Sequence, residues 1–186
     1  GVACAVPVTV PYQRYSTHGA HWFIGQALHA LVRASGIPKD QIDGLTVSSF
    51  SLAPDTAVGV TQHLGVSPRW LDHIPTGGAS GVMALRRAAR AVQAGDADIV
   101  ACIAADTNHV DSFRMMLGSF SDFARDASYP YGAGGPNSIF AFITANYMRE
   151  FGARREDFGR IAVYQRTNAL KNPNALFKKP LSLDEY

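Results

Sequence analysis

The sequence predicts an α/β fold in which helices cover both faces of a mainly parallel β-sheet. Strand-like and helix-like segments alternate through residues 1–105, an order typical of parallel sheets with crossover helices. The segment 97–105 is also an almost unbroken apolar run, as expected of a strand covered on both faces. We therefore predict a three-layer architecture with a mainly parallel sheet.

Composition limits the class of protein further. The chain has 186 residues, of which 47% are apolar and 17% are charged, as in an ordinary globular protein with its own core. A net charge of +2, without basic runs that alternate with aromatics, argues against a nucleic-acid partner. The sequence contains no run of about 18 apolar residues, the length that a membrane-spanning helix needs. Cys4 and Cys102 lie in apolar runs without metal-ligand spacing, so we expect buried free thiols, no metal and a cytoplasmic location.

The elements of the first part follow from local signals. We predict strands at 2–10, 45–50, 68–74 and 97–105, and helices at 19–35, 55–64 and 79–94. Ser16 or Thr17 is the expected cap of the first helix, and Asp55 of the second. Gly36, and glycines at the ends of the two later helices, are the expected terminators.

The pattern changes after residue 105. Residues 106–135 combine acidic, aromatic and glycine residues without a regular period, which indicates a long loop that serves as a lid or an insertion. Two helices are expected at 136–151 and 154–170, followed by a basic, turn-rich segment. We therefore predict an α/β core over 1–105 and a loop domain with helices over 106–186.

A glycine-rich turn is the first candidate functional feature. Gly77 and Gly78 precede the apolar helix 79–94, which we expect to be buried between two layers. The N-terminus of such a helix presents free N–H groups and the positive end of its dipole, which suit a carbonyl, a thioester or an anion. The turn matches neither a Walker loop nor a dinucleotide fingerprint, and the small residues could simply allow close helix packing.

Four side chains are weaker candidates. Ser80 lacks the nucleophile-elbow pattern and reads more readily as a capping or packing serine than as a nucleophile. His73 precedes the turn and His109 stands at the start of the long loop, so both could line a cleft. A histidine with a purely structural role is the more common alternative. Lys178, in the basic segment, suits an acidic ligand such as a CoA phosphate, with a solvated loop as the alternative.

Several segments together resemble the thiolase superfamily. The stretch 78–85, Gly-Ala-Ser-Gly-Val-Met-Ala-Leu, is similar to the family's Cys-Ala-Ser-Gly-x-x-Ala-Leu, in which the cysteine is the nucleophile at the N-terminus of a buried helix. The other matching segments are 34–44, 94–100, 145–152, 154–157 and 166–174. The sterol-carrier-protein type, which includes the lipid-transfer group, is the nearest in pattern. The resemblance implies a thiolase-like N-terminal half, truncated before the final core strand and before a second half that repeats the fold.

The resemblance also implies where chemistry would occur. Gly78 stands at the position of the nucleophile, and glycine cannot form an acyl-enzyme. The site would retain Ala79 as a backbone N–H donor, with Gly77 and Ser80 beside the substrate. Family patterns further imply an acyl-CoA ligand without a separate cofactor, and either a homodimer through the N-terminal half or a complementary chain. A partner protein with an OB fold or zinc ribbon is a further expectation.

Three functions remain open at this point. The first is retro-aldol cleavage or formation of a C–C bond in a CoA thioester, with the turn stabilising an enolate. The second is a non-catalytic pseudo-thiolase that binds acyl-CoA or lipid, or that scaffolds a partner. The third is an acyltransferase of the family type that uses another nucleophile.

Overall fold

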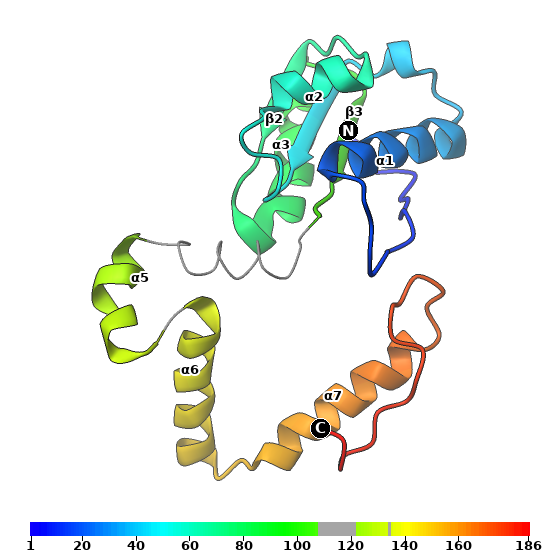
Figure 1. Ribbon diagram of the computed structural model, residues 1–186. Coiled ribbons are helices and arrows are strands. Elements are labelled where there is room, and N and C mark those ends of the chain that lie inside the picture. The colour runs from blue at the N-terminus through cyan, green and yellow to red at the C-terminus, as the bar shows by residue number, and fades with distance from the viewer. Residues whose placement is uncertain (108–121, 134) are drawn as a thin grey trace. The chain divides into compact units, whose positions relative to one another are not determined.

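The computed structural model describes residues 1–107, 122–133 and 135–186. The chain divides into two compact units, Gly1–Thr107 and Asn108–Tyr186. Each unit has its own internal contacts and is described separately below (Figure 1).

The first unit is built on a parallel sheet. Its strands are β1 (Gly44–Ser48), β2 (Trp70–His73) and β3 (Val100–Ala104). They lie in the order β2-β1-β3, and both pairs are parallel. All five residues of the central strand β1 are buried, as expected for a strand with a neighbour on each side and a helix layer on each face. The predicted α/β fold with a parallel sheet is confirmed.

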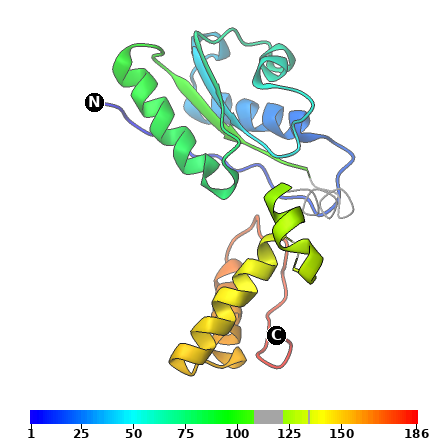
Figure 2. The ribbon, with the colours of Figure 1, turned by 90° about the vertical axis from the view of Figure 1, so that its left-hand side faces the viewer.

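Helices cover both faces of this sheet. They are α1 (Ala20–Ser35), α2 (Ala57–Leu64) and α3 (Ser80–Ala94). Figure 2 shows α1 and α3 on opposite sides of the strands. On the side of α1 and α2, Ile24, Leu28 and Val60 pack with Leu45 and Val47 in the main core cluster. The three layers are therefore α3, the sheet, and α1 with α2.

The predicted burial of the helix after the glycine turn is wrong for this unit. Helix α3 buries one stripe of small residues against the sheet, namely Ser80, Ala84, Ala88 and Ala91. Small side chains at this spacing let the helix lie close to the strands. Its outer face is open, with Val82 74% and Leu85 48% exposed. The helix is thus amphipathic rather than buried on all sides.

The N-terminal strand is also absent from the described residues. Residues 2–10 have no ladder partner in the sheet, and Val6 has a φ of 57°. That value lies in the left-handed region, which interrupts an extended strand. A Val-rich segment favours the extended conformation of a strand. A strand also needs the free edge of a sheet with which it can pair.

Glycine terminators are confirmed and side-chain caps are not. Gly36, Gly65 and Gly95 each end a helix in the left-handed conformation, as in the usual C-terminal motif. Neither Ser16 nor Thr17 caps α1, since Gly19 occupies the N-cap and no side chain bonds there. The predicted Asp55 cap of α2 is also wrong, because Thr56 is the N-cap residue.

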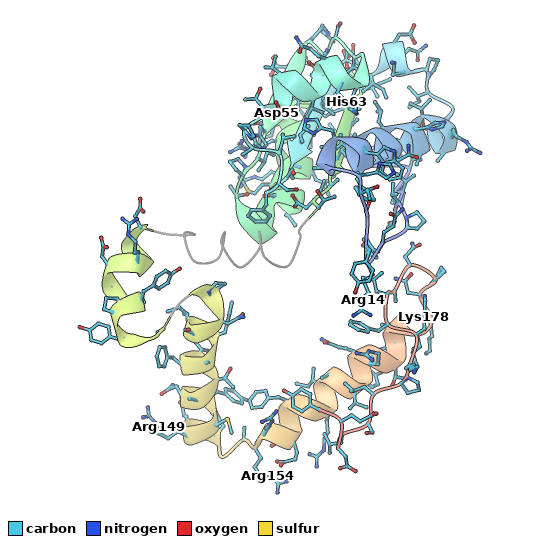
Figure 3. All side chains as sticks on the ribbon, viewed as in Figure 1. Arg14, Asp55, His63, Arg149, Arg154 and Lys178 are labelled. Atoms are coloured by element: carbon cyan, nitrogen blue, oxygen red, sulfur yellow. The ribbon has the colours of Figure 1, made fainter. Side chains whose placement is uncertain are left out.

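Asp55 instead connects two helices. Its carboxylate lies 3.2 Å from Nε2 of His21 on α1, and the His21 ring packs edge-on against His63 of α2. Figure 3 shows Asp55 and His63 at this side of the first unit. Among the described residues, no three His, Cys, Asp or Glu side chains are grouped to hold a metal ion.

The second unit consists of helices and turns. Its elements are α5 (Asp122–Ala127), a 3-10 turn (Tyr129–Tyr131), α6 (Gly135–Phe151) and α7 (Arg155–Ala169). The two last helices confirm those expected at 136–151 and 154–170. The long-loop prediction fails over its described part, because α5 and the 3-10 turn lie within it. The C-terminal segment folds back on α7, where Arg155 lies over the Tyr186 ring and Arg166 over the Phe177 ring. No helix in the described part is long and apolar enough to cross a membrane.

Candidate active site

A cavity of about 220 Å³ lies at the carboxyl ends of β1 and β3. This is where ligands bind in open α/β sheets. Two strand ends and the glycine turn form it, and its lining residues are Ser48, Ser49, Phe50, Ile74, Pro75, Gly77, Gly78, Ser80, Gly81, Ala104 and Asp106. The turn singled out in the sequence therefore borders a cavity at the functional edge of the sheet.

The turn is a short 3-10 helix that runs directly into α3. It spans Gly77–Ala79, and Thr76 precedes it. Gly77 has a φ of +63°, a conformation that a residue with a side chain rarely adopts. The Thr76 N–H donates to Ser80 Oγ at 3.1 Å, and the two hydroxyls lie 3.3 Å apart. Because its hydroxyl is bound within the turn and the residue is buried, Ser80 shapes the site as a packing and positioning residue.

Gly78 offers backbone and space to the cavity. A Cβ built on Gly78 meets no atom within 4 Å, and its φ lies outside the left-handed region. The first N–H groups of a helix have no partner inside the helix, and Gly78 lies in this first turn beside the cavity. Ala79, the predicted N–H donor, belongs to the same turn but does not line the cavity.

The three remaining predicted site residues are His73, Lys178 and His109. His73 ends β2 outside the lining, with Nε2 buried and without a hydrogen-bond partner. Lys178 lies in the second unit (Figure 3), where its ammonium donates to the carbonyls of Asn172 and Pro173 at 3.2 and 2.8 Å. That pairing favours a structural role in its own turn. His109 lies outside the described residues.

Neither cysteine replaces the family's nucleophile. Cys4 is exposed and Cys102 is half-buried on β3, and both are free thiols. Burial, and next the nearby Cys4, raise the pKa of Cys102 to about 11. A thiol held protonated at neutral pH is a poor nucleophile. Covalent thioester chemistry at Cys102 is therefore disfavoured.

Phe50 and Asp106 are among the lining residues that the sequence analysis did not single out. Phe50 follows β1, and Asp106 follows β3. Asp106 Oδ1 accepts hydrogen bonds from the Phe50 N–H at 2.6 Å and from the Ser51 N–H at 2.9 Å. The signal that could have found Asp106 is its place, directly after an apolar strand, where a parallel sheet presents polar side chains to a ligand.

Comparisons with known proteins show which curated proteins this chain is similar to. The chain is 30% identical over 171 residues to a steroid side-chain-cleaving aldolase of Thermomonospora curvata. This alignment covers 87% of the present chain and 43% of the aldolase. The chain is 30% identical over 168 residues to a 17-hydroxy-3-oxo-4-pregnene-20-carboxyl-CoA lyase of Mycobacterium tuberculosis, with 86% and 43% covered. An acetyl-CoA acetyltransferase of Methanocaldococcus jannaschii is 30% identical over 161 residues, with 83% and 40% covered. No protein-family model matches the chain.

A solved structure gives the same result for the fold. The Ltp2-ChsH2(DUF35) aldolase matches with a TM-score of 0.72 and 26% identity, over 91% of this chain and 44% of that chain. The chain thus spans less than half the length of the relatives it matches. Sequence motifs, the parallel sheet and these similarities agree, and the chain belongs to the thiolase-like superfamily, in its lipid-transfer group.

Proposed function

We propose that the complete protein cleaves a C–C bond of a β-hydroxyacyl-CoA thioester by a retro-aldol reaction. The observation that carries the proposal is Gly78, which stands at the nucleophile position, adds no side chain and borders a cavity at a helix N-terminus. Such a site can polarise a thioester oxygen without becoming acylated. Relatives named as an aldolase and a CoA lyase support the same reaction class.

The proposed reaction conserves atoms and electrons, and besides C–C cleavage it involves only proton transfers. A base takes the proton of the β-hydroxyl, the Cα–Cβ bond breaks, and its electron pair forms an enolate of the thioester. The Gly78 N–H and the helix dipole stabilise the developing charge on the thioester oxygen. Protonation at Cα then gives a shorter acyl-CoA and an aldehyde or ketone. We propose no separate cofactor, since CoA is part of the substrate.

The base is expected from a part of the complete protein beyond these residues. Asp106 is the one titratable residue that lines the described cavity. Two backbone N–H groups and the hydroxyls of Ser49 and Ser51 already occupy its Oδ1. These four hydrogen bonds connect Asp106 to the segment after β1, so we assign it a structural role and not that of the base.

A pseudo-thiolase that binds acyl-CoA without turnover is the second candidate. The same open space at Gly78 favours it, because loss of the nucleophile enlarges the room for a ligand. An acyltransferase, as in the archaeal relative, needs a nucleophile, and the described candidates are a turn-bound Ser80 hydroxyl and a protonated Cys102 thiol. That third function is therefore the least supported.

One experiment separates the three functions. The complete protein is incubated with β-hydroxyacyl-CoA thioesters, and separately with a β-ketoacyl-CoA plus CoA, and the products are identified by mass spectrometry. Release of an aldehyde or ketone from the hydroxy substrate supports the proposal. Calorimetric binding of acyl-CoA without any product supports the pseudo-thiolase, and thiolysis of the keto substrate would establish an acyltransferase.

The proposal includes an assembly and a location. The similar solved structure pairs its Ltp2 chain with a DUF35 protein, so we propose a comparable small partner here, and a homodimer through the first unit as the alternative or additional assembly. A DUF35 protein from the same source organism is added to the assay, and light scattering gives the mass of each complex. We propose a cytoplasmic location, which fractionation of the native cells tests.

A further inference from the structure

A hydrogen-bond cluster joins the end of β3 to the segment that follows β1. Asp106 Oδ1 accepts from the hydroxyls of Ser49 and Ser51 at 2.8 and 3.0 Å, in addition to the N–H groups of Phe50 and Ser51. The Thr107 N–H in turn donates to Ser51 Oγ at 2.9 Å. We call these residues the Asp106 clamp.

The clamp controls a wall of the cavity. Ser49 and Phe50 lie beyond β1, where the strand ladder no longer holds the chain. Phe50 lines the cavity and is 45% exposed, so its position depends on its backbone. Its ring Cζ lies 3.6 Å from the place of a Cβ on Gly77. Fixing the Phe50 backbone therefore fixes an aromatic wall beside the glycine turn.

We propose that Asp106 is a positioning residue that holds Phe50 against the glycine turn and so sets the width of the cavity beside Gly78. This rests on the proposed function for its catalytic consequence, because substrate would lie between the wall and the Gly78 N–H. The wall itself is a property of the first unit. It can be measured without substrate.

The other end of β1 provides a matched control. Asp43, just before β1, accepts from the N–H groups of Asp98 and Ile99, just before β3, at 2.8 to 3.1 Å. Both aspartates thus bind two consecutive backbone N–H groups and connect the same two strands. Asp43 lies at the amino ends of β1 and β3, whereas the cavity lies at their carboxyl ends, and Asp43 does not line the cavity. Asp43→Ala therefore removes a similar connection, together with the Arg69 ion pair, without touching the site.

The first test measures the cavity wall in the complete protein with the probe substitution Gly78→Cys. Iodoacetamide reacts with the introduced thiol, and mass spectrometry gives the rate. Adding Asp106→Ala is expected to raise this rate about twofold or more, because the wall opens. Asp106→Asn keeps an acceptor oxygen and removes the charge, so it should restore the rate of Gly78→Cys alone. Asp43→Ala should leave that rate unchanged.

Two results overturn the proposal. If Asp106→Asn reacts as fast as Asp106→Ala, the effect is that of the lost charge. If Asp43→Ala has the effect of Asp106→Ala, the effect is general destabilisation. With the hydroxyacyl-CoA that the wild type cleaves, Asp106→Ala should lower kcat/KM about ten- to a hundredfold, with Asp106→Asn close to wild type. A wild type that cleaves nothing refutes the proposed function, while the alkylation rates still decide the role of Asp106.

Discussion

A thiol introduced at Gly78 measures directly whether the glycine turn stabilises negative charge. The substitution Gly78→Cys is sterically open, since a Cβ there meets no atom within 4 Å. A helix N-terminus stabilises an adjacent anion by about 0.3 to 2 kcal/mol. About 1.36 kcal/mol corresponds to one pKa unit, and an ordinary cysteine has a pKa of about 8.5. The thiolate fraction at pH 7 should therefore rise about 1.6- to 16-fold.

The expected increase in the alkylation rate is smaller than the increase in the thiolate fraction. A thiolate of lower pKa is a weaker nucleophile, and its intrinsic reactivity falls with a Brønsted slope of about 0.4 to 0.5. The two effects together predict alkylation about 1.3- to fourfold faster than that of an ordinary exposed cysteine. Cys4, which is exposed, is the internal reference, and half-buried Cys102 with its pKa of about 11 should react slowest.

The opposite end of α3 gives the control. Gln93→Cys places a thiol on an exposed position of the last helical turn, where the dipole disfavours an anion. Its thiol should react more slowly than that of Gly78→Cys at equal exposure. Equal rates for the two variants, or a Gly78→Cys rate no higher than that of Cys4, would refute the reasoning that the turn stabilises an enolate.

Three further predictions concern stability, measured by denaturant unfolding of the complete protein. Gly44→Ala should destabilise by about 1–3 kcal/mol, since its Cβ would lie 2.6 Å from Val100 Cγ2; a change below the experimental error contradicts this crowding. Gly77→Ala should cost about 1–2 kcal/mol because of its positive φ, whereas Gly78→Ala should stay within about 0.5 kcal/mol, and equal costs would contradict the assigned conformations. Burial alone would raise the pKa of Asp43, but hydrogen bonds from neighbouring N–H groups and from a guanidinium lower it below its ordinary 3.8. The stabilisation of the folded state by the ionised Asp43 is therefore complete above pH 3.8. It is lost as the pH falls through and below that value. Asp43→Asn should therefore flatten the acid limb of the stability profile.

Local signals in the sequence predicted much of the first unit. The three glycine terminators work through the backbone of one residue, which is why Gly36, Gly65 and Gly95 are found where expected. The unbroken apolar run 97–105 predicted β3 for a similar reason, since continuous apolar residues fit a strand covered on both faces. Each of these features depends on a few consecutive residues.

The predictions that failed depend on distant partners. Residues 2–10 have the composition of a strand but no edge to pair with in this unit. Asp55 could have capped α2 by its position, but it pairs with His21, which is far earlier in the chain. Asp106 was passed over because its donors precede it by 55 to 57 residues. A sequence pattern does not reveal which of several possible partners a carboxylate will meet.

The geometry of the turn explains why the glycine at position 78 points to substrate rather than to folding. Gly77 is required by its backbone, since its φ of +63° disfavours any side chain. Gly78 has neither a left-handed φ nor a neighbour that a Cβ would touch. Glycine in such a place is a stability cost that Ala would avoid. The absence of a side chain at Gly78 therefore supports the proposed binding of a substrate in the cavity that Phe50 and Gly78 line.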